Sequence, residues 1–153
     1  IAADVAANIG GGTLRIEALQ AHPSTRNDYA QAVLGYDRTF SPPWLPAGIY
    51  FALEIFYNGD ATAQPPVYSD KLETRNTRFA GLSLGYDLTP LWRLGWTGLY
   101  DIDGESAFSA PSLSWSPTKN STVTAAAQIA YGGVAGEYGA YPNQYFLLME
   151  QVF

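Results

Sequence analysis

The chain has 153 residues, which is the size of one domain and enough to bury a core. It contains no cysteine, which excludes disulfides, zinc thiolates and thiol chemistry, and its net charge of −6 argues against nucleic acid as a partner. Only 14% of the residues are charged, fewer than a water-facing surface normally carries, and 14% are aromatic. We therefore expect part of the outer surface not to face water.

Apolar and polar residues alternate with period two along most of the chain, and helical periodicity is nearly absent. No apolar run approaches the ~20 residues that a transmembrane helix needs. Residues 1–12 are interpreted either as an irregular lead-in or as the stub of a further strand before a Gly turn, and residues 13–153 as the folded domain. The domain is predicted to be all-β with eight strands, at residues 13–22, 28–40, 47–58, 78–89, 91–102, 106–116, 121–132 and 143–153.

The connections between these strands alternate in length. Those at 41–46, 89–91 and 116–120 are short and contain Pro, whereas those at 59–77 and 133–142 are longer and rich in Gly, Pro and polar residues. This alternation predicts a meander of hairpins in which each strand pairs with the next.

Each predicted strand has one face of large apolar residues and another of Gly, Ala, Ser and Thr with scattered charges. In the strand at 47–58, for example, Leu53 and Ile55 lie on the apolar face and Glu54 on the other. Aromatic residues concentrate at both ends of the apolar faces. Those near the short connections are Tyr36, Tyr86, Trp92 and Trp115, and those near the longer ones are Tyr57, Tyr100, Tyr131 and Tyr145.

Three architectures could cover such an apolar face. A soluble, lipocalin-like barrel turns it inward, a β-sandwich packs it against a second sheet, and a transmembrane barrel turns it outward into lipid. Two aromatic bands separated by aliphatic residues are typical of the two membrane interfaces, and strands of about ten residues can cross the hydrocarbon. The pattern favours the transmembrane barrel.

The last strand and the repeated turn segment resemble those of bacterial outer-membrane β-barrel proteins of the porin type. The repeat is LGYDRTFSP at 34–42 and LGYDLTP at 84–90, and the chain ends in YFLLMEQVF. In that family the final strand ends in an aromatic residue, and the machinery that assembles barrels recognises that strand. Tyr145, Leu147 and Met149 match the alternating apolar positions and Phe153 the terminal aromatic, while Gln151 departs from the pattern.

The resemblance implies an up-and-down antiparallel transmembrane β-barrel in the outer membrane of a Gram-negative bacterium. Short turns would then be periplasmic and longer loops extracellular, as in such barrels. The implied partners are outer-membrane lipids, the barrel assembly machinery and small solutes; no cofactor is implied.

Two motifs suggest chemistry but are explained better by strand structure. The segment GLSLG at 81–85 fits G-x-S-x-G, which in hydrolases requires a strand–turn–helix. Here Ser83 is predicted mid-strand, no helix follows, and the only histidine, His22, falls near a loop, so we predict no enzyme. Gly81 and Gly85 would make room for a neighbouring side chain or narrow the wall. The segment DIDGES at 101–106 lacks most ligands of a calcium loop and is predicted to be a hairpin turn.

Seven charged residues fall on the polar faces of the predicted strands. They are Arg15, Glu17, Asp37, Glu54, Asp87, Arg93 and Glu150. They could form an Arg–carboxylate network that fills a narrow barrel, or they could line a lumen in which carboxylates outnumber arginines and favour cations. Glutamates in contact with the arginines would indicate the filling network, and glutamates in contact with water would indicate the lumen lining.

Two functions follow from these alternatives. The first is a porin-like passive channel for small solutes. Eight strands enclose a lumen that side chains fill, and open porins use about sixteen. A channel would therefore require the chain to be the C-terminal part of a larger barrel, or several chains to assemble. The second is a closed small barrel that anchors, or binds through its loops, without transport.

Overall fold

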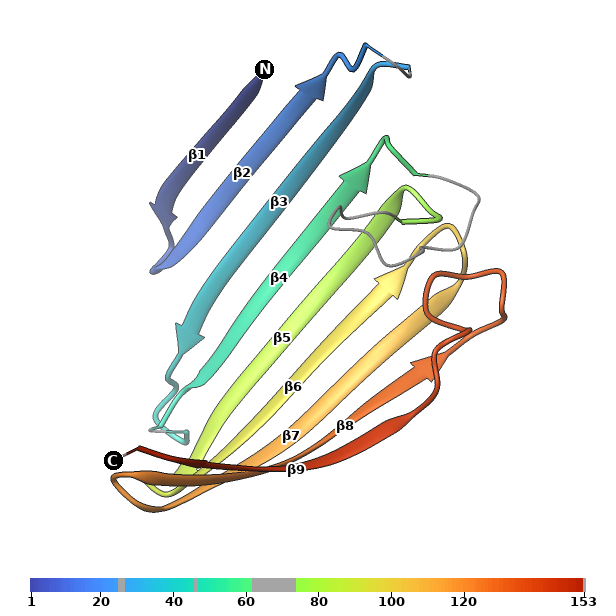
Figure 1. The fold of residues 1–153 in the computed structure, drawn as a ribbon. Helices are drawn as coiled ribbons and strands as arrows, with labels where there is room; N and C mark the ends of the chain where they lie inside the picture. The colour runs from blue at the N-terminus through green and yellow to red at the C-terminus, as the bar shows by residue number, and fades with distance from the viewer. Residues whose placement is uncertain (25–26, 46, 62–73, 153) are drawn as a thin grey trace.

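The computed structural model describes residues 1–24, 27–45, 47–61 and 74–152. These residues form a single antiparallel sheet of nine strands, each paired with the next along the chain (Figure 1). Among them, no helix is long and apolar enough to cross a membrane. The strands are β1 (Ala2–Ile9), β2 (Gly12–Ala21), β3 (Tyr29–Phe40), β4 (Ile49–Asn58), β5 (Arg78–Thr89), β6 (Trp92–Asp101), β7 (Ser106–Thr118), β8 (Ser121–Tyr131) and β9 (Gln144–Gln151).

The all-β meander is confirmed, but the predicted number of eight strands is wrong. The eight predicted strands coincide with β2–β9 to within two residues at each end. The ninth, β1, comes from the segment at 1–12 and pairs with β2 from Ala2↔Leu19 to Ile9↔Gly12. Gly10 and Gly11 form the turn with φ of 59° and 78°, a conformation that favours glycine and suits a two-residue hairpin.

The sheet is open. It twists and curves from β1 to β9, and these two strands form its edges without pairing with each other (Figure 1). The described residues therefore do not make the closed barrel that was predicted. One end of the strands, the short-turn end, carries the connections at 10–11, 90–91 and 119–120 and the described part of 41–48. The other, the long-loop end, carries the connections at 102–105 and 132–143 and the described parts of 22–28 and 59–77.

The strand register defines two faces, because directly paired residues point to the same side of an antiparallel sheet. One row on the apolar side, here called the outer face, crosses eight strands. Its residues are Val5, Ile16, Leu34, Ile55, Ala80, Tyr100, Ala107 and Tyr131. The opposite side, the inner face, carries the polar residues; one of its rows runs from Arg15 through Gly35, Glu54 and Gly81 to Leu99.

The protein has almost no buried apolar interior in the part that the structure describes. Phe79 is the one large apolar side chain there that is buried. On the outer face, Val5 is 63% exposed, Ile55 48% and Leu147 76%. Among the described residues, no second layer of strands or helices covers either face of the sheet, so its apolar side depends on a surrounding medium or on a partner.

Candidate functional site on the inner face

The two inner-face arginines pair with aspartates rather than with glutamates. Arg15 Nη2 lies 2.7 Å from Asp37 Oδ1, and Arg93 Nη1 lies 3.2 Å from Asp87 Oδ1. Both pairs lie toward the short-turn end and keep substantial exposure. They are therefore solvated ion pairs that fix the positions of the arginines, and they do not form the network expected to fill the interior of a narrow barrel.

The three glutamates expected to line a lumen remain unpaired. Glu17, Glu54 and Glu150 lie on the inner face, and within the described residues none of them has a hydrogen bond or an ion pair. The sequence analysis missed Asp4, which lies on β1 directly opposite Glu17. Its signal was present, because Asp4 interrupts the alternating small residues of the segment at 1–12.

The GLSLG segment lies within β5. The Ser83 hydroxyl is 3.1 Å from the Thr97 hydroxyl on β6, so it belongs to a cross-strand pair of hydroxyls. A Cβ atom at Gly81 would lie 3.2 Å from Leu99 Cδ2, and one at Gly85 would lie 2.9 Å from Arg93 Nη2. The two glycines thus make room for larger side chains of β6, as one of the two expectations had it.

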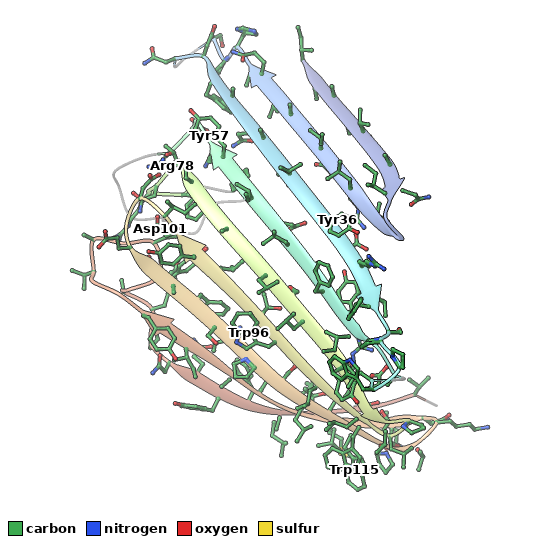
Figure 2. All side chains as sticks on the ribbon, turned by 180° about the vertical axis from the view of Figure 1, so that it is seen from behind. Tyr36, Tyr57, Arg78, Trp96, Asp101 and Trp115 are labelled. Carbon is green, nitrogen blue, oxygen red and sulfur yellow. The ribbon has the colours of Figure 1, made fainter. Side chains whose placement is uncertain are left out.

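Asp101, the last residue of β6, lies at the long-loop end. Its side chain is fully buried, and its two oxygens accept four hydrogen bonds. The donors are Asn76 Nδ2 at 2.6 Å, Gly104 N at 2.9 Å, Ser106 Oγ at 3.1 Å and Glu137 N at 2.9 Å. This cluster, the Asp101 hub, ties together three connections that are distant in the sequence; Figure 2 shows Asp101 near Arg78 and Tyr57 at this end.

The hub holds the β8–β9 connection against the inner face. Arg75 N donates to Glu137 Oε2 at 2.8 Å, and Arg75 Nη1 donates to the carbonyl oxygen of Val134 at 2.7 Å. The ring of Tyr138 packs on Phe108 of β7 with 6.1 Å between centroids. Residues 134–138 therefore lie over one end of the inner face.

The expected hairpin turn in DIDGES is present, and its Asp103 binds the start of β5. Its carboxylate accepts hydrogen bonds from Thr77 Oγ1 at 2.6 Å and from Arg78 Nε at 2.7 Å. The hydrogen bond from the Arg78 guanidinium, with those from Thr77, holds the pKa of Asp103 well below its usual range. No group of three His, Cys, Asp or Glu side chains that could hold a metal ion occurs within the described ranges.

A pocket of about 500 Å³ lies between this connection and the strands beneath it. Phe56 and Phe79 form part of its wall, with Glu54 beside them and Tyr138 and Tyr141 on the loop side. Of the seven residues predicted to line a lumen, Glu54 is the one that borders this pocket. The pocket depends on the folding of residues 134–141 back over β3–β6, for which a strand pattern holds no signal.

On the outer face, aromatic side chains form two bands. The register places Tyr36, Tyr86, Trp92 and Trp115 toward the short-turn end, and Tyr57, Tyr100, Tyr131 and Tyr145 toward the long-loop end. Trp92 and Trp115 stack with 5.6 Å between ring centroids, and Figure 2 shows Trp115 at the end opposite Tyr57. Trp96 also lies on the outer face, but mid-strand between the two bands, and it donates from Nε1 to Ser109 Oγ at 2.9 Å.

The proposed assembly signal falls on the edge strand β9. Tyr145, Leu147 and Met149 lie on the outer face and are 74%, 76% and 68% exposed. Phe153 lies outside the described residues.

The sequence matches no known protein-family model, and neither a curated protein nor a solved structure is significantly similar to it.

Proposed function

We propose that the chain forms part of the wall of an outer-membrane β-barrel, with the outer face against lipid and the inner face lining a passage for small solutes. The observation that carries this proposal is the polarity of the two faces. Exposed Val, Leu, Ile, Tyr and Trp cover one side of the sheet. The charged residues of the described strands lie on the other side, except Arg38 and Arg78, which are near strand ends on the outer face. In water such an apolar face would be unfavourable, whereas in lipid it is the favourable arrangement.

The lengths of the strands and the two aromatic bands agree with this proposal. The strands have 8–13 residues, and a tilted transmembrane strand needs about 9–11. The bands flank a zone of aliphatic residues such as Leu34 and Leu82, in the positions where aromatic girdles meet the membrane interfaces.

The number of strands supports a barrel larger than this sheet. Because neighbouring strands alternate in direction, β1 and β9 both run from the long-loop end to the short-turn end. Pairing them with each other would be parallel, and copies inserted in the same orientation would also meet in parallel. An entirely antiparallel barrel therefore needs an odd number of further strands between β9 and β1. Closure is required in lipid, where an unpaired sheet edge leaves backbone groups without partners.

The charges on the inner face favour cations. Arg15 and Arg93 are neutralised by Asp37 and Asp87, and the unpaired side chains of Asp4, Glu17, Glu54 and Glu150 add negative charge along the same face. Rings of carboxylates select cations in pores.

A second candidate is binding through the loops without transport. The Asp101 hub favours it, because four hydrogen bonds to one buried carboxylate keep three connections in a single arrangement. A rigid set of loops at one end suits recognition as well as it suits a pore entrance.

The test has two parts. First, the chain is refolded into liposomes whose acyl chains are brominated near the bilayer centre or near the interface. We expect tryptophan fluorescence to be quenched by bromines at both depths, since Trp92 and Trp115 lie at a strand end and Trp96 lies mid-strand on the same face. Fluorescence that is insensitive to both would overturn the membrane assignment.

Second, currents are recorded in planar bilayers for the wild type and the triple variant E17Q/E54Q/E150Q. Asp28→Asn serves as the control, because it removes a carboxylate that lies in a loop beside His22. In these bilayers the chain can enclose a pore only where copies meet through parallel pairs of β9 with β1. From such assemblies we expect cation-selective steps whose selectivity falls in the triple variant and not in the control. Steps with the same selectivity in the wild type and in the triple variant would overturn the passage along the inner face and favour the loop-binding alternative.

A further inference from the structure

The pocket beneath the β8–β9 connection differs from the rest of the inner face in having an aromatic wall. Phe56 and Phe79 stack with 6.1 Å between their ring centroids and 26° between their planes. Tyr138 and Tyr141 close the pocket from the loop side, and Leu99 adds an aliphatic surface. A volume of about 500 Å³ is in the range of sites for small organic molecules.

Carboxylates supply the formal charges of this pocket. Glu54 lies against Gly35 of the neighbouring strand, where a Cβ atom would be 3.4 Å from Glu54 Cγ, so the glycine leaves room for the glutamate. Its carboxylate makes no hydrogen bond or ion pair within the described residues. Glu137 adds a second carboxylate, of which Oε2 accepts the Arg75 amide. No lysine or arginine is among the described residues that line the pocket.

Tyr138, on the loop side of the pocket, remains a neutral hydrogen-bond donor. Burial, with the nearby charges of Glu137 and Asp101, raises the pKa of Tyr138 to about 12. The pocket therefore carries negative charge from carboxylates alone, next to the π faces of two phenylalanines.

We propose that this pocket binds a small organic cation that has an apolar or aromatic body. The cationic group would face Glu54 and Glu137, and the body would pack on Phe56 and Phe79. A cation is attracted to an aromatic face, and the attraction strengthens as the site is desolvated. This inference rests on the proposed function and deepens it, because it names the class of solute that the passage retains.

Two other pockets among the described residues lack this combination. The pocket on the outer face, near Leu53, Leu82 and Trp96, contains no charged residue. The one beside Asp4 and Glu17 has carboxylates, but Phe56 at its margin is its single aromatic side chain. Carboxylate and aromatic wall coincide beneath the β8–β9 connection.

Binding is tested by isothermal titration of the full chain in detergent micelles with benzyltrimethylammonium, corrected for titration into empty micelles. Phenylacetate has the same ring with a negative charge, and tetramethylammonium has the cation without the ring. We expect saturable binding of benzyltrimethylammonium, weaker binding of tetramethylammonium and none of phenylacetate. Equal binding of all three, or no saturable binding, would overturn the proposal.

Two pairs of variants locate the site. Glu54→Gln should weaken binding about two- to fivefold, as expected from the loss of one solvated ion pair. Phe56→Leu should weaken it by a similar factor of about two to five, because it removes a π face at nearly constant size. The controls are Glu150→Gln and Phe146→Leu, which change the same residue types on the inner face of β9. Equal effects of the control variants would overturn the location.

Conductance separates this inference from the proposed function. Cation-selective steps that benzyltrimethylammonium does not block, without saturable binding, would overturn the pocket and leave the passage intact. Saturable binding together with steps whose ion selectivity is unchanged in the triple variant E17Q/E54Q/E150Q would overturn the passage and leave the pocket.

Discussion

Replacing Asp101 tests whether the hub holds the loops. In the Asp101→Asn variant, the amide oxygen can keep the place of Oδ2, where it accepts from Asn76, Ser106 and Glu137. The amide NH₂ then takes the place of Oδ1 and faces the backbone N–H of Gly104. One hydrogen bond is lost, and the amide N–H and the Gly104 N–H, both donors, face each other. The other three hydrogen bonds are kept, but their acceptor is no longer charged. Each hydrogen bond to a charged group contributes about 1.5–3 kcal/mol, so we expect the hub to lose about 2–4 kcal/mol.

The loss should be local, because the strand register does not depend on Asp101. Amide hydrogen exchange, followed by NMR in detergent, should accelerate by at least about 30-fold at Gly104, Glu137 and Tyr138, since each 1.4 kcal/mol of local stability corresponds to tenfold. Amides in the middle of β3 and β4 should be unaffected. The control Asp28→Asn breaks an exposed pair with His22 and should change exchange at the hub little. Unchanged exchange at Gly104 and Glu137 in Asp101→Asn would refute the assignment of the hub.

Three further predictions address the faces, the turns and pH. Leu147→Arg places a charge on the outer face of β9 and should lower the free energy of unfolding from lipid by about 2–4 kcal/mol. The control Gln128→Arg, on the inner face of β8, should be tolerated. Equal losses of unfolding free energy for the two variants in lipid vesicles would contradict the orientation of the sheet. Gly12→Ala would drive a methyl group into the Asp37 carbonyl oxygen and the Tyr36 hydroxyl and should destabilise by about 1–3 kcal/mol, while Gly133→Ala meets nothing within 4 Å and should be neutral in denaturant titrations. Because the pKa of Asp103 is lowered in the folded state, its contribution to the stability of the fold is fully present above the unfolded-state pKa of about 4 and is lost only as the pH falls through the lower folded-state pKa. The backbone amides of Thr77 and Arg78, which donate to Asp103, should therefore stay protected from hydrogen exchange at pH 4. Fast exchange of these two amides at pH 4 would contradict the prediction.

The inner-face glutamates show what the alternation of polar and apolar residues can predict. Alternation assigns Glu17, Glu54 and Glu150 to the polar face, because the strand repeat of two residues is local and each residue carries its own polarity. The same alternation identified β2–β9. It did not settle whether residues 1–12 form a strand, since Ala-rich segments such as AADVAANI have too little contrast between their faces.

The pairing of charges was beyond that reasoning. Arg15 selects Asp37, 22 residues away, and leaves Glu17 free, because the partner depends on strand register and on the reach of two side chains. The pattern also predicted a closed barrel of eight strands, and the described residues form an open sheet of nine. Whether an edge strand is paired depends on backbone N–H and C=O groups of another strand, and the alternation of residues along one strand does not specify that partner.

By itself, the sequence determined strands β2–β9, their order and the polarity of their faces, because these follow from neighbours two residues apart. Only the tertiary structure decided the Asp101 hub and the aromatic–carboxylate pocket. The hub joins Asn76, Asp101 and Glu137, separated by 25 and 36 residues, and the pocket exists because that hub folds the β8–β9 connection back over Phe56 and Phe79. Such contacts depend on where loops return in space, and the residue type of a loop carries little of that information.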